Sequence, residues 1–310
     1  MYFDPIYAVP IFLYGLTLGS FLNVCIYRMP RQMSVIRPSS ACPLCQAHIA
    51  WYDNLPVVSW LLLRGRCRAC KGRISPRYLL VELLIGLLFV ACYATFSWTF
   101  SMFKFCAFAF LLVGLIFTDA EHKLLPDALT LSGLVLGLAF SLLVPVQDLG
   151  SRLLSGWIKL PMWSDFSWRL LSLLDSGLGA AAGASFIYGA GAIYRRARGV
   201  EGMGFGDVKL MGMVGAFLGV KLTIFTLFAA SLVGSMFGLA AMLAVWWKRA
   251  RRRMIRQHEP AATARKRAWK SAMMIYRHYE MPFGVFLGSM ALVAAFFGNR
   301  LIGWYWGFYR

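Results

Sequence analysis

The residues most able to do chemistry are four carboxylates at the ends of apolar segments. Among only 13 Asp and Glu residues, Glu82 lies just inside one apolar run, Asp119 ends the next, and Asp127 and Asp207 each open a further one. Ionisable groups at membrane depth are costly and usually face a cavity or a partner. These four side chains are therefore the first candidates for a functional site.

Asp119 and Asp207 are the pair best suited to activate water. If the apolar runs alternate in direction, the chain leaves the membrane at Asp119 and enters it at Asp207 on the same side. Two close carboxylates cannot both ionise cheaply, so one keeps a proton while the other acts as a base on a water that attacks a carbonyl. The shared proton later goes to the leaving amine. This is peptide hydrolysis without a covalent intermediate or a catalytic metal, and no GxSxG or HExxH motif competes with it.

Three alternating glycines, Gly202, Gly204 and Gly206, precede Asp207. They permit an unusual backbone beside the acid, which leaves room for an extended substrate strand, and irregular backbone at membrane depth is tolerated where it lines a cavity. The simpler alternative is a loop that leads into a helix, with Asp207 as a favourable N-terminal acid. Asp127 follows a proline at a helix start, so a cap is the alternative for it, and it is the weaker catalytic candidate.

The seven cysteines divide into two groups. Three lie in apolar runs and are most simply small buried hydrophobes; the other four are Cys42, Cys45, Cys67 and Cys70. Two CxxC pairs separated by 21 residues match a four-thiolate zinc site, because each pair places two sulfurs on one turn. Disulfides and a redox pair are the alternatives, of which the first is disfavoured in a reducing cytoplasm. The prediction is structural zinc with no open coordination position.

The composition is that of a membrane protein. The chain has 310 residues, of which 59% are hydrophobic and 15% charged. Apolar runs long enough to cross a bilayer are found at 8–27, 78–98, 102–118, 127–146, 176–194, 207–219, 221–247 and 281–298. The sequence therefore predicts an all-α polytopic membrane protein with about eight transmembrane helices.

The net charge of +19 is explained first by membrane topology, before any charged ligand is considered. Segments 28–77, 119–126, 195–209 and 248–280 hold nine, one, four and eleven of the 32 Lys and Arg residues. All four fall on one side of a membrane if eight spans alternate, so the positive-inside rule predicts that they are cytoplasmic and that the N-terminus is outside. We expect contact with anionic membrane lipids and no nucleic-acid binding.

These segments suggest a domain organisation. Residues 1–27 form a first transmembrane anchor, and 28–77 form a cytoplasmic four-cysteine zinc domain. Residues 78–310 form the membrane domain that carries the aspartates, with an external loop at 147–175 and a basic, amphipathic cytoplasmic loop at 248–280. No internal repeat is evident.

Several motifs resemble one family, the bifunctional type IV prepilin leader peptidase/N-methyltransferases. The resemblance covers nearly the whole chain, from GSFLNVCIYRMP (19–30) and the two CxxC pairs to EGMGFGDVKL (201–210) and MPFGVFLG (281–288). It implies an inner-membrane aspartic peptidase of the GxGD type, with Asp119 and Asp207 as its pair. It also implies that the peptidase cuts the basic leader from type IV prepilins or type II secretion pseudopilins.

The resemblance further implies methylation of the new N-terminal amine with S-adenosylmethionine. The sequence shows no glycine loop that would place this cofactor, and Asp53 and Asn54 are the only candidates it offers. A basic leader would be repelled by the +19 charge unless local acids such as Asp53, Glu121 and Glu201 compensate. A peptidase without methyltransferase activity, an ion-coupled transporter and a non-catalytic scaffold are the alternatives.

Overall fold

The structure, a computed structural model, describes residues 4–146, 165–199, 204–256, 260–277 and 281–307. In these ranges the chain is helical and contains no strand beyond two isolated β-bridges, which confirms the predicted all-α class. In chain order, the elements are α1 Pro5–Arg28, η1 Met29–Arg31, η2 Trp51–Asn54, α2 Val58–Leu62, α3 Arg77–Phe96, α4 Phe100–His122, α5 Asp127–Ser141, α7 Asp165–Arg198, α8 Phe205–Arg256, α9 Ala261–Arg277 and α10 Phe283–Gly307.

Six of the described helices are long and apolar enough to cross a membrane, namely α1, α3, α4, α7, α8 and α10. The sequence predicted about eight spans, and two features explain the difference. First, α5 is apolar but only 15 residues long. Second, α8 contains two of the predicted runs, which are separated by a non-helical residue at Gly219. The chain is thus a multi-pass membrane protein.

The chain reverses direction at Gly219, where φ is 77° and ψ is 177°. Just after it, the Lys221 ammonium donates to Asn299 Oδ1 near the end of α10. Thirteen positions later, Gly234 lies against Phe286 at the start of α10. The second part of α8 therefore runs antiparallel to α10 and returns toward the end of the bundle from which α8 began.

A Gly219→Ala substitution should lower the stability of the protein. Backbone with this φ and ψ is accessible almost only to glycine, and forcing another residue into it costs of order 1–3 kcal/mol. We expect a lower midpoint of thermal unfolding in detergent. The matched control is Gly234→Ala in the same helix, where a new methyl group would meet Phe286 at an ordinary 3.6 Å. Equal midpoints for the two variants would contradict the strained reversal.

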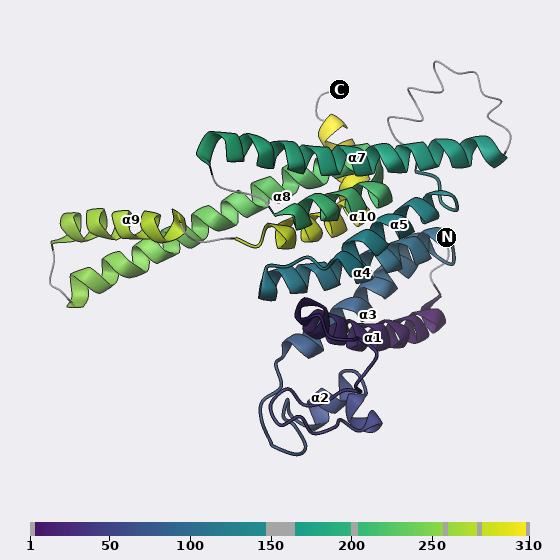
Figure 1. The fold of residues 1–310 in the computed structure, drawn as a ribbon, viewed down its shortest axis with the longest axis horizontal. Helices are drawn as coiled ribbons and strands as arrows, with labels where there is room; N and C mark the ends of the chain where they lie inside the picture. Colours follow the sequence, from purple (N-terminus) through teal and green to yellow (C-terminus); the bar gives the residue numbers. More distant parts are fainter. Residues whose placement is uncertain (1–3, 147–164, 200–203, 257–259, 278–280, 308–310) are drawn as a thin grey trace.

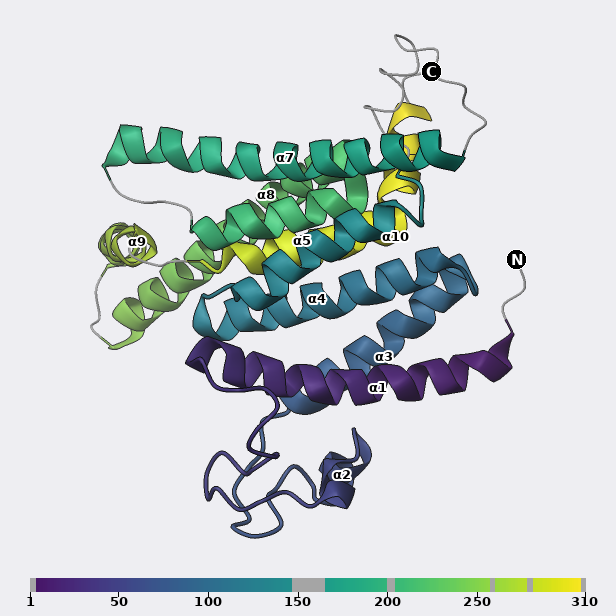
Figure 2. The same ribbon diagram turned by 45° about the vertical axis from the view of Figure 1, so that its right-hand side comes forward.

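The bundle is layered around α4. One face of α4 packs in a hydrophobic cluster with α1 and α3. Its other face belongs to a second cluster, to which α5, α7, α8 and α10 also contribute. Figures 1 and 2 show the same order. Helices α1 and α3 lie on one side of α4, whereas α5, α8 and α10 lie on its other side, and α7 is outermost. This arrangement makes α4 the central element, and its C-terminal turn is where Asp119 lies.

The segment between α1 and α3 forms a small separate lobe against these two helices, below the bundle in Figure 1. Its chain begins at the end of α1 and returns at the start of α3, so it is held at the same end of the bundle as the α4 C-terminus. Two contacts fix this junction: Arg77 pairs with Glu121, and the Arg31 guanidinium lies 3.5 Å from His122 Nε2.

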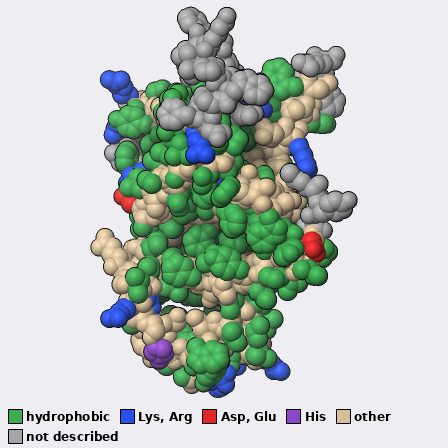
Figure 3. Space-filling model, turned by 90° about the vertical axis from the view of Figure 1, so that its right-hand side faces the viewer, with side chains coloured by type: hydrophobic (Ala, Val, Ile, Leu, Met, Phe, Trp, Pro, Cys, Tyr) green, Lys and Arg blue, Asp and Glu red, His purple; other side chains and the backbone are tan. Residues whose placement is uncertain are grey.

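Figure 3 looks onto the opposite end of the bundle, where hydrophobic side chains predominate.

The two predicted loops differ in part from the helices that the structure contains. Residues 147–164 of the predicted external loop lie outside the described residues, but its last part is the beginning of α7. Asp175, expected in that loop, is a fully buried residue of α7. In the basic segment, α8 continues to Arg256 and α9 follows it, so most of the predicted 248–280 loop is helical. Trp246 and Trp269 pack edge to face between these two helices, with ring centroids 6.1 Å apart.

Candidate active site

Two buried carboxylates lie at one end of the bundle, on helices from different parts of the chain. Asp119 is in the last turn of α4 and 6% exposed, and Asp207 is in the first turn of α8 and 9% exposed. The sequence predicted that these two residues would meet at one depth. The structure brings both to one place, since a single side chain, Leu125, reaches the residue before Asp207 and the glycine that packs on Asp119.

Asp119 is held by the N-terminus of α10. Its Oδ2 accepts a hydrogen bond from the backbone N–H of Val285 at 3.0 Å. Val285 is the third residue of α10, so its N–H has no partner within the helix, and a carboxylate at a helix N-terminus is favoured. Gly284 allows this approach, since a Cβ there would lie 2.8 Å from Asp119 Oδ2. The MPFG segment thus fixes the orientation of one of the two carboxylates.

Asp207 follows directly on the glycine-rich loop. α8 begins at Phe205, and the backbone N–H of Asp207 bonds to the carbonyl of Gly204 at 3.1 Å. Gly206 packs against Leu125, and a Cβ added at Gly206 would lie 3.1 Å from the Cβ of Leu125. Of the predicted glycines, Gly202 lies outside the described residues. The helix start at Asp207 agrees with the alternative of an N-terminal acid, which does not exclude a catalytic role.

Leu125 lies between the two carboxylate-bearing elements. Its side chain contacts Gly206, next to Asp207, and also approaches Gly284, next to Asp119. The turn that carries Leu125 joins α4 to α5 and follows a left-handed residue, Lys123, with φ 52°. The LLPD segment therefore positions an apolar residue between the acids.

Asp127 is not part of this pair. It opens α5 and is half-exposed, and its Oδ1 accepts a hydrogen bond from the Lys209 ammonium at 2.6 Å. Lys209 is two residues beyond Asp207, so the ion pair ties the start of α5 to the start of α8. The predicted alternative of a cap is wrong, because Pro126 occupies the N-cap position and no side chain caps α5. Asp127 instead joins two helix starts at the edge of the site.

A Gly284→Ala protein should cut substrate at least about ten-fold more slowly than the parent. The new methyl group would push the Asp119 carboxylate away from Val285, and a displacement of about 1 Å from a reacting geometry can cost up to about 100-fold in rate. Gly303→Ala is the control in the same helix, because a Cβ there meets no neighbouring side chain or helix within 4 Å among the described residues. Similar cleavage rates for both variants would argue against Gly284 as a positioning residue.

The four predicted cysteines converge. Their sulfur atoms all lie within 4.8 Å of one another, and Cys42 Sγ is 3.9 Å from Cys70 Sγ. Four thiolates at about 2.3 Å from one tetrahedral zinc ion lie about 3.8 Å apart, so the cluster fits this metal. Backbone N–H groups of Cys70 and Ala69 lower the pKa of the Cys67 thiol to about 7. The backbone N–H of Ala47 lowers the pKa of the Cys45 thiol, but burial and hydrogen bonds with the other three thiols outweigh it and raise that pKa to about 11, so a bound metal would have to displace that proton.

The cysteine pairs form an internal repeat that the sequence analysis missed. In both halves the first cysteine exchanges backbone hydrogen bonds with the residues four and five positions later, and an isoleucine N–H bonds back across the turn. The second half repeats the first with an offset of 25 positions, from Cys42 to Cys67. The shared pattern CxxCxxxI in CPLCQAHI and CRACKGRI could have revealed it.

Other predicted acids have separate partners. Asp53 is held by Arg68 through two bonds of 2.7 Å, and the guanidinium lowers the pKa of the Asp53 carboxyl. Glu121 is held by Arg77. Neither is a free charge that could attract a basic leader, which weakens that part of the interpretation; Glu201 lies outside the described residues.

Glu82 lies apart from the aspartates, in α3. It is 7% exposed, and its Oε2 accepts a hydrogen bond from the backbone N–H of Val57 at 2.8 Å. It lines a cavity between α1, α3 and the segment that joins them, residues 29–76, here called the cysteine segment. Asp53 and Asn54 line the same cavity. The structure therefore brings three of the predicted residues, Glu82, Asp53 and Asn54, together in a cavity that is separate from the aspartate pair.

Comparisons with known proteins agree with these two regions. Residues 13–96 match the Bacterial Peptidase A24 N-terminal domain, and residues 106–239 match the Type IV leader peptidase family. A Prepilin leader peptidase/N-methyltransferase of Myxococcus xanthus is 39% identical over 246 residues, which are 78% of this chain and 65% of the relative.

Two further relatives carry the same name. The protein of Aeromonas salmonicida is 30% identical over 325 residues, covering 97% of this chain and 94% of the relative. The protein of Neisseria gonorrhoeae is 34% identical over 256 residues, covering 74% of this chain and 80% of the relative. No solved structure matches the chain.

Proposed function

This chain belongs to the type IV leader peptidase family, and from that premise we propose that it is an aspartic endopeptidase that removes the leader from prepilins or pseudopilins. The observation that carries the proposal is the pair of buried carboxylates, Asp119 on α4 and Asp207 on α8, beside Leu125. Each group comes from a rigid helix end, which suits a site that must hold reacting groups within small tolerances.

In the proposed reaction, one of the two carboxylates takes a proton from water while the water oxygen bonds to the scissile carbonyl carbon. The carbon–nitrogen bond then breaks, and the proton held by the other carboxylate goes to the leaving amine. Val285 N–H keeps Asp119 in place during these transfers. Water supplies the new oxygen and the balance of protons, so no covalent intermediate forms.

The proposed substrate has an apolar helix in the membrane and a basic leader on the cytoplasmic side. The concentration of Lys and Arg in the four segments adjoining one end of the bundle supports the orientation, with the zinc domain and both aspartates cytoplasmic and the N-terminus outside. The prepilin relatives support the substrate class. The site then meets the scissile bond where the substrate chain leaves the membrane.

The second proposed activity is N-methylation of the new N-terminus with S-adenosylmethionine. The names of the relatives support it, and the segment of this chain that matches the Bacterial Peptidase A24 N-terminal domain contains the four cysteines. The cofactor supplies an activated methyl group, and this chain's residues must bind it and bring the amine close to it. Zinc on the four cysteines would be structural, because all four positions around the metal are thiolates.

An ion-coupled transporter is the alternative from another class. An ion path requires polar groups spaced along the interior of the bundle. Ionisable residues other than the aspartate pair, among them Lys104 of α4 and Asp175 of α7, are also buried in the bundle. The α4 segment between Lys104 and Asp119 packs through apolar side chains, among them Phe108, Leu112 and Leu115. This apolar stretch disfavours a continuous path.

The proposal is tested by incubating the purified protein, in detergent micelles, with a prepilin precursor. We expect the leader to appear as a separate mass, and the mature chain to gain the mass of one methyl group when S-adenosylmethionine is added. Cleavage without methylation would reduce the proposal to a peptidase. An intact precursor beside a folded protein would overturn it and favour transport.

A further inference from the structure

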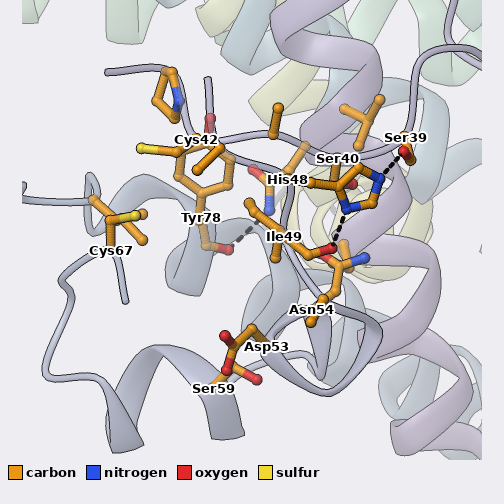
Figure 4. Close-up of a pocket in the computed structure, with 18 of the residues that line it drawn as sticks. Ser39, Ser40, Cys42, His48, Ile49, Asp53, Asn54, Ser59, Cys67 and Tyr78 are labelled. Atoms are coloured by element: carbon orange, nitrogen blue, oxygen red, sulfur yellow. Dashed lines mark hydrogen bonds between the residues drawn. The ribbon is translucent and has the colours of Figure 1, made fainter. Parts of the chain in front are cut away.

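A partly open cavity of about 430 Å³ lies between the cysteine segment and the paired helices α1 and α3. Its size is within the range of pockets that hold small molecules, about 300–1,000 Å³. Figure 4 shows residues of the cysteine segment around it, including Ser39, His48 and Asp53, with Tyr78 contributed by α3. Cys42 and Cys67 also line the cavity, so the metal cluster shapes one wall.

Two buried polar atoms in this wall have no hydrogen-bond partner among the described residues. One is Asn23 Oδ1 on α1, whose amide nitrogen is already used by the carbonyl of Tyr78 at 3.0 Å. The other is the indole Nε1 of Trp60 in α2. Buried polar groups are nearly always paired, because leaving one unpaired destabilises the fold. Both residues line the cavity, so a small movement of each side chain would bring this acceptor and this donor to a ligand bound there.

The cavity also contains a carboxylate that is not neutralised by a cation. Asp53 is paired with Arg68, but Glu82 accepts hydrogen bonds from the backbone N–H of Val57 and from the hydroxyl of Ser20, neither of which is a cation. Within the described residues, no Lys, Arg or His forms an ion pair with Glu82. Buried charges are normally paired, so Glu82 favours a ligand that is positively charged.

We propose that this cavity is the binding site for the methyl donor, S-adenosylmethionine, and that Glu82, Asn23 and Trp60 are its polar contacts. The proposal rests on the methyltransferase function proposed above. The donor carries positive charge on its sulfonium and amino groups, which suits Glu82. Its amino groups can donate to Asn23 Oδ1, and its ring nitrogens can accept from Trp60 Nε1.

A second role for Glu82 must be separated from ligand binding. Val57 has a left-handed backbone, with φ 63°, which is unusual for a β-branched residue, and the Glu82 carboxylate holds its N–H in place. Glu82→Gln retains an oxygen that can accept this hydrogen bond but removes the negative charge. This variant therefore tests the charge with little change to the local fold.

The experiment measures equilibrium binding of S-adenosylmethionine to the full-length, zinc-loaded protein in detergent by calorimetry. Glu82→Gln should bind at least about ten-fold more weakly than the parent, since a hydrogen bond to a charged group is worth about 1.5–3 kcal/mol. Trp60→Phe should also bind more weakly, while its unfolding midpoint without ligand stays equal or rises. Glu121→Gln is the matched control, because its carboxylate is held by Arg77 outside the cavity, and it should bind as the parent does.

Prepilin cleavage, followed in the same preparations, separates the failures. If the parent binds the donor and Glu82→Gln and Trp60→Phe bind it equally well, the site is wrong while the methyltransferase function stands. If the parent cuts the precursor but neither binds the donor nor methylates the product, both the site and the methyltransferase function are wrong. If Trp60→Phe lowers the unfolding midpoint and leaves binding unchanged, Trp60 is a structural residue only and that contact is overturned.

Discussion

An Asp207→Asn protein should cut a prepilin about a thousand-fold more slowly than the parent. Asparagine fills the same volume but cannot take a proton from water, and removing a general acid or base costs about 100- to 10,000-fold in rate. Asp207 lies in the first turn of α8 and is 9% exposed, so the neutral side chain leaves the helix start intact. The measurement is the initial rate of leader release in detergent micelles, followed by mass.

The control for this prediction is methylation of a peptide that already has the mature N-terminus. The aspartates belong to α4 and α8, whereas the proposed donor site is built from α1, α3 and the cysteine segment. Asp207→Asn should therefore methylate this peptide at the parental rate. A variant that lost both activities together with its thermal transition would have lost its fold. Its loss of cleavage would then not distinguish catalysis by Asp207 from catalysis by a different residue. Asp119→Asn, which can still accept from Val285 N–H, provides the second and independent variant.

Replacing Cys42 or Cys67 by serine should remove the zinc and most of the methylation. A tetrahedral thiolate site that loses one ligand binds zinc far more weakly, and metal binding of this kind supplies much of the folding free energy of a small domain. The cavity loses a wall when the cluster opens, because both cysteines line it. We expect metal analysis to fall from about one zinc per chain to near zero, with prepilin cleavage reduced far less than methylation.

Cys106→Ala is the control for the cysteine variants. Cys106 is buried in α4, far along the sequence from the cluster, and it packs in the core shared with α1 and α3. Its replacement should leave the zinc content unchanged and cost only some packing energy. Equal zinc in the Cys42→Ser protein and the parent would contradict the metal site.

The sequence predicted the helices and the candidate residues because both are encoded locally. Apolar length identifies a membrane helix, and even the reversal within α8 was foreseen as the boundary between the runs 207–219 and 221–247. The pairing of Asp119 with Asp207 followed from the alternation of spans. The four-cysteine cluster followed from two CxxC pairs, since each pair is a single turn.

The features that the sequence did not predict are contacts between residues far apart along the chain. The bond from Val285 to Asp119 joins positions 166 apart, and no local pattern announces which helix N-terminus will face which acid. The bond from Val57 to Glu82 is similar, and so is the cavity that both segments enclose. Asp175 fell within the predicted external loop 147–175, whereas the structure places it, fully buried, in the long helix α7.

The central claim, that Asp119 and Asp207 act as one catalytic unit, is tested most directly by comparing four proteins in one prepilin cleavage assay. These are the parent, Asp119→Asn, Asp207→Asn and the double variant, each shown to be folded by its thermal transition. Residues that act together give strongly non-additive losses. The account predicts that each single variant loses nearly all cleavage and that the double variant is no slower than either. Cleavage by either single variant at close to the parental rate would contradict it.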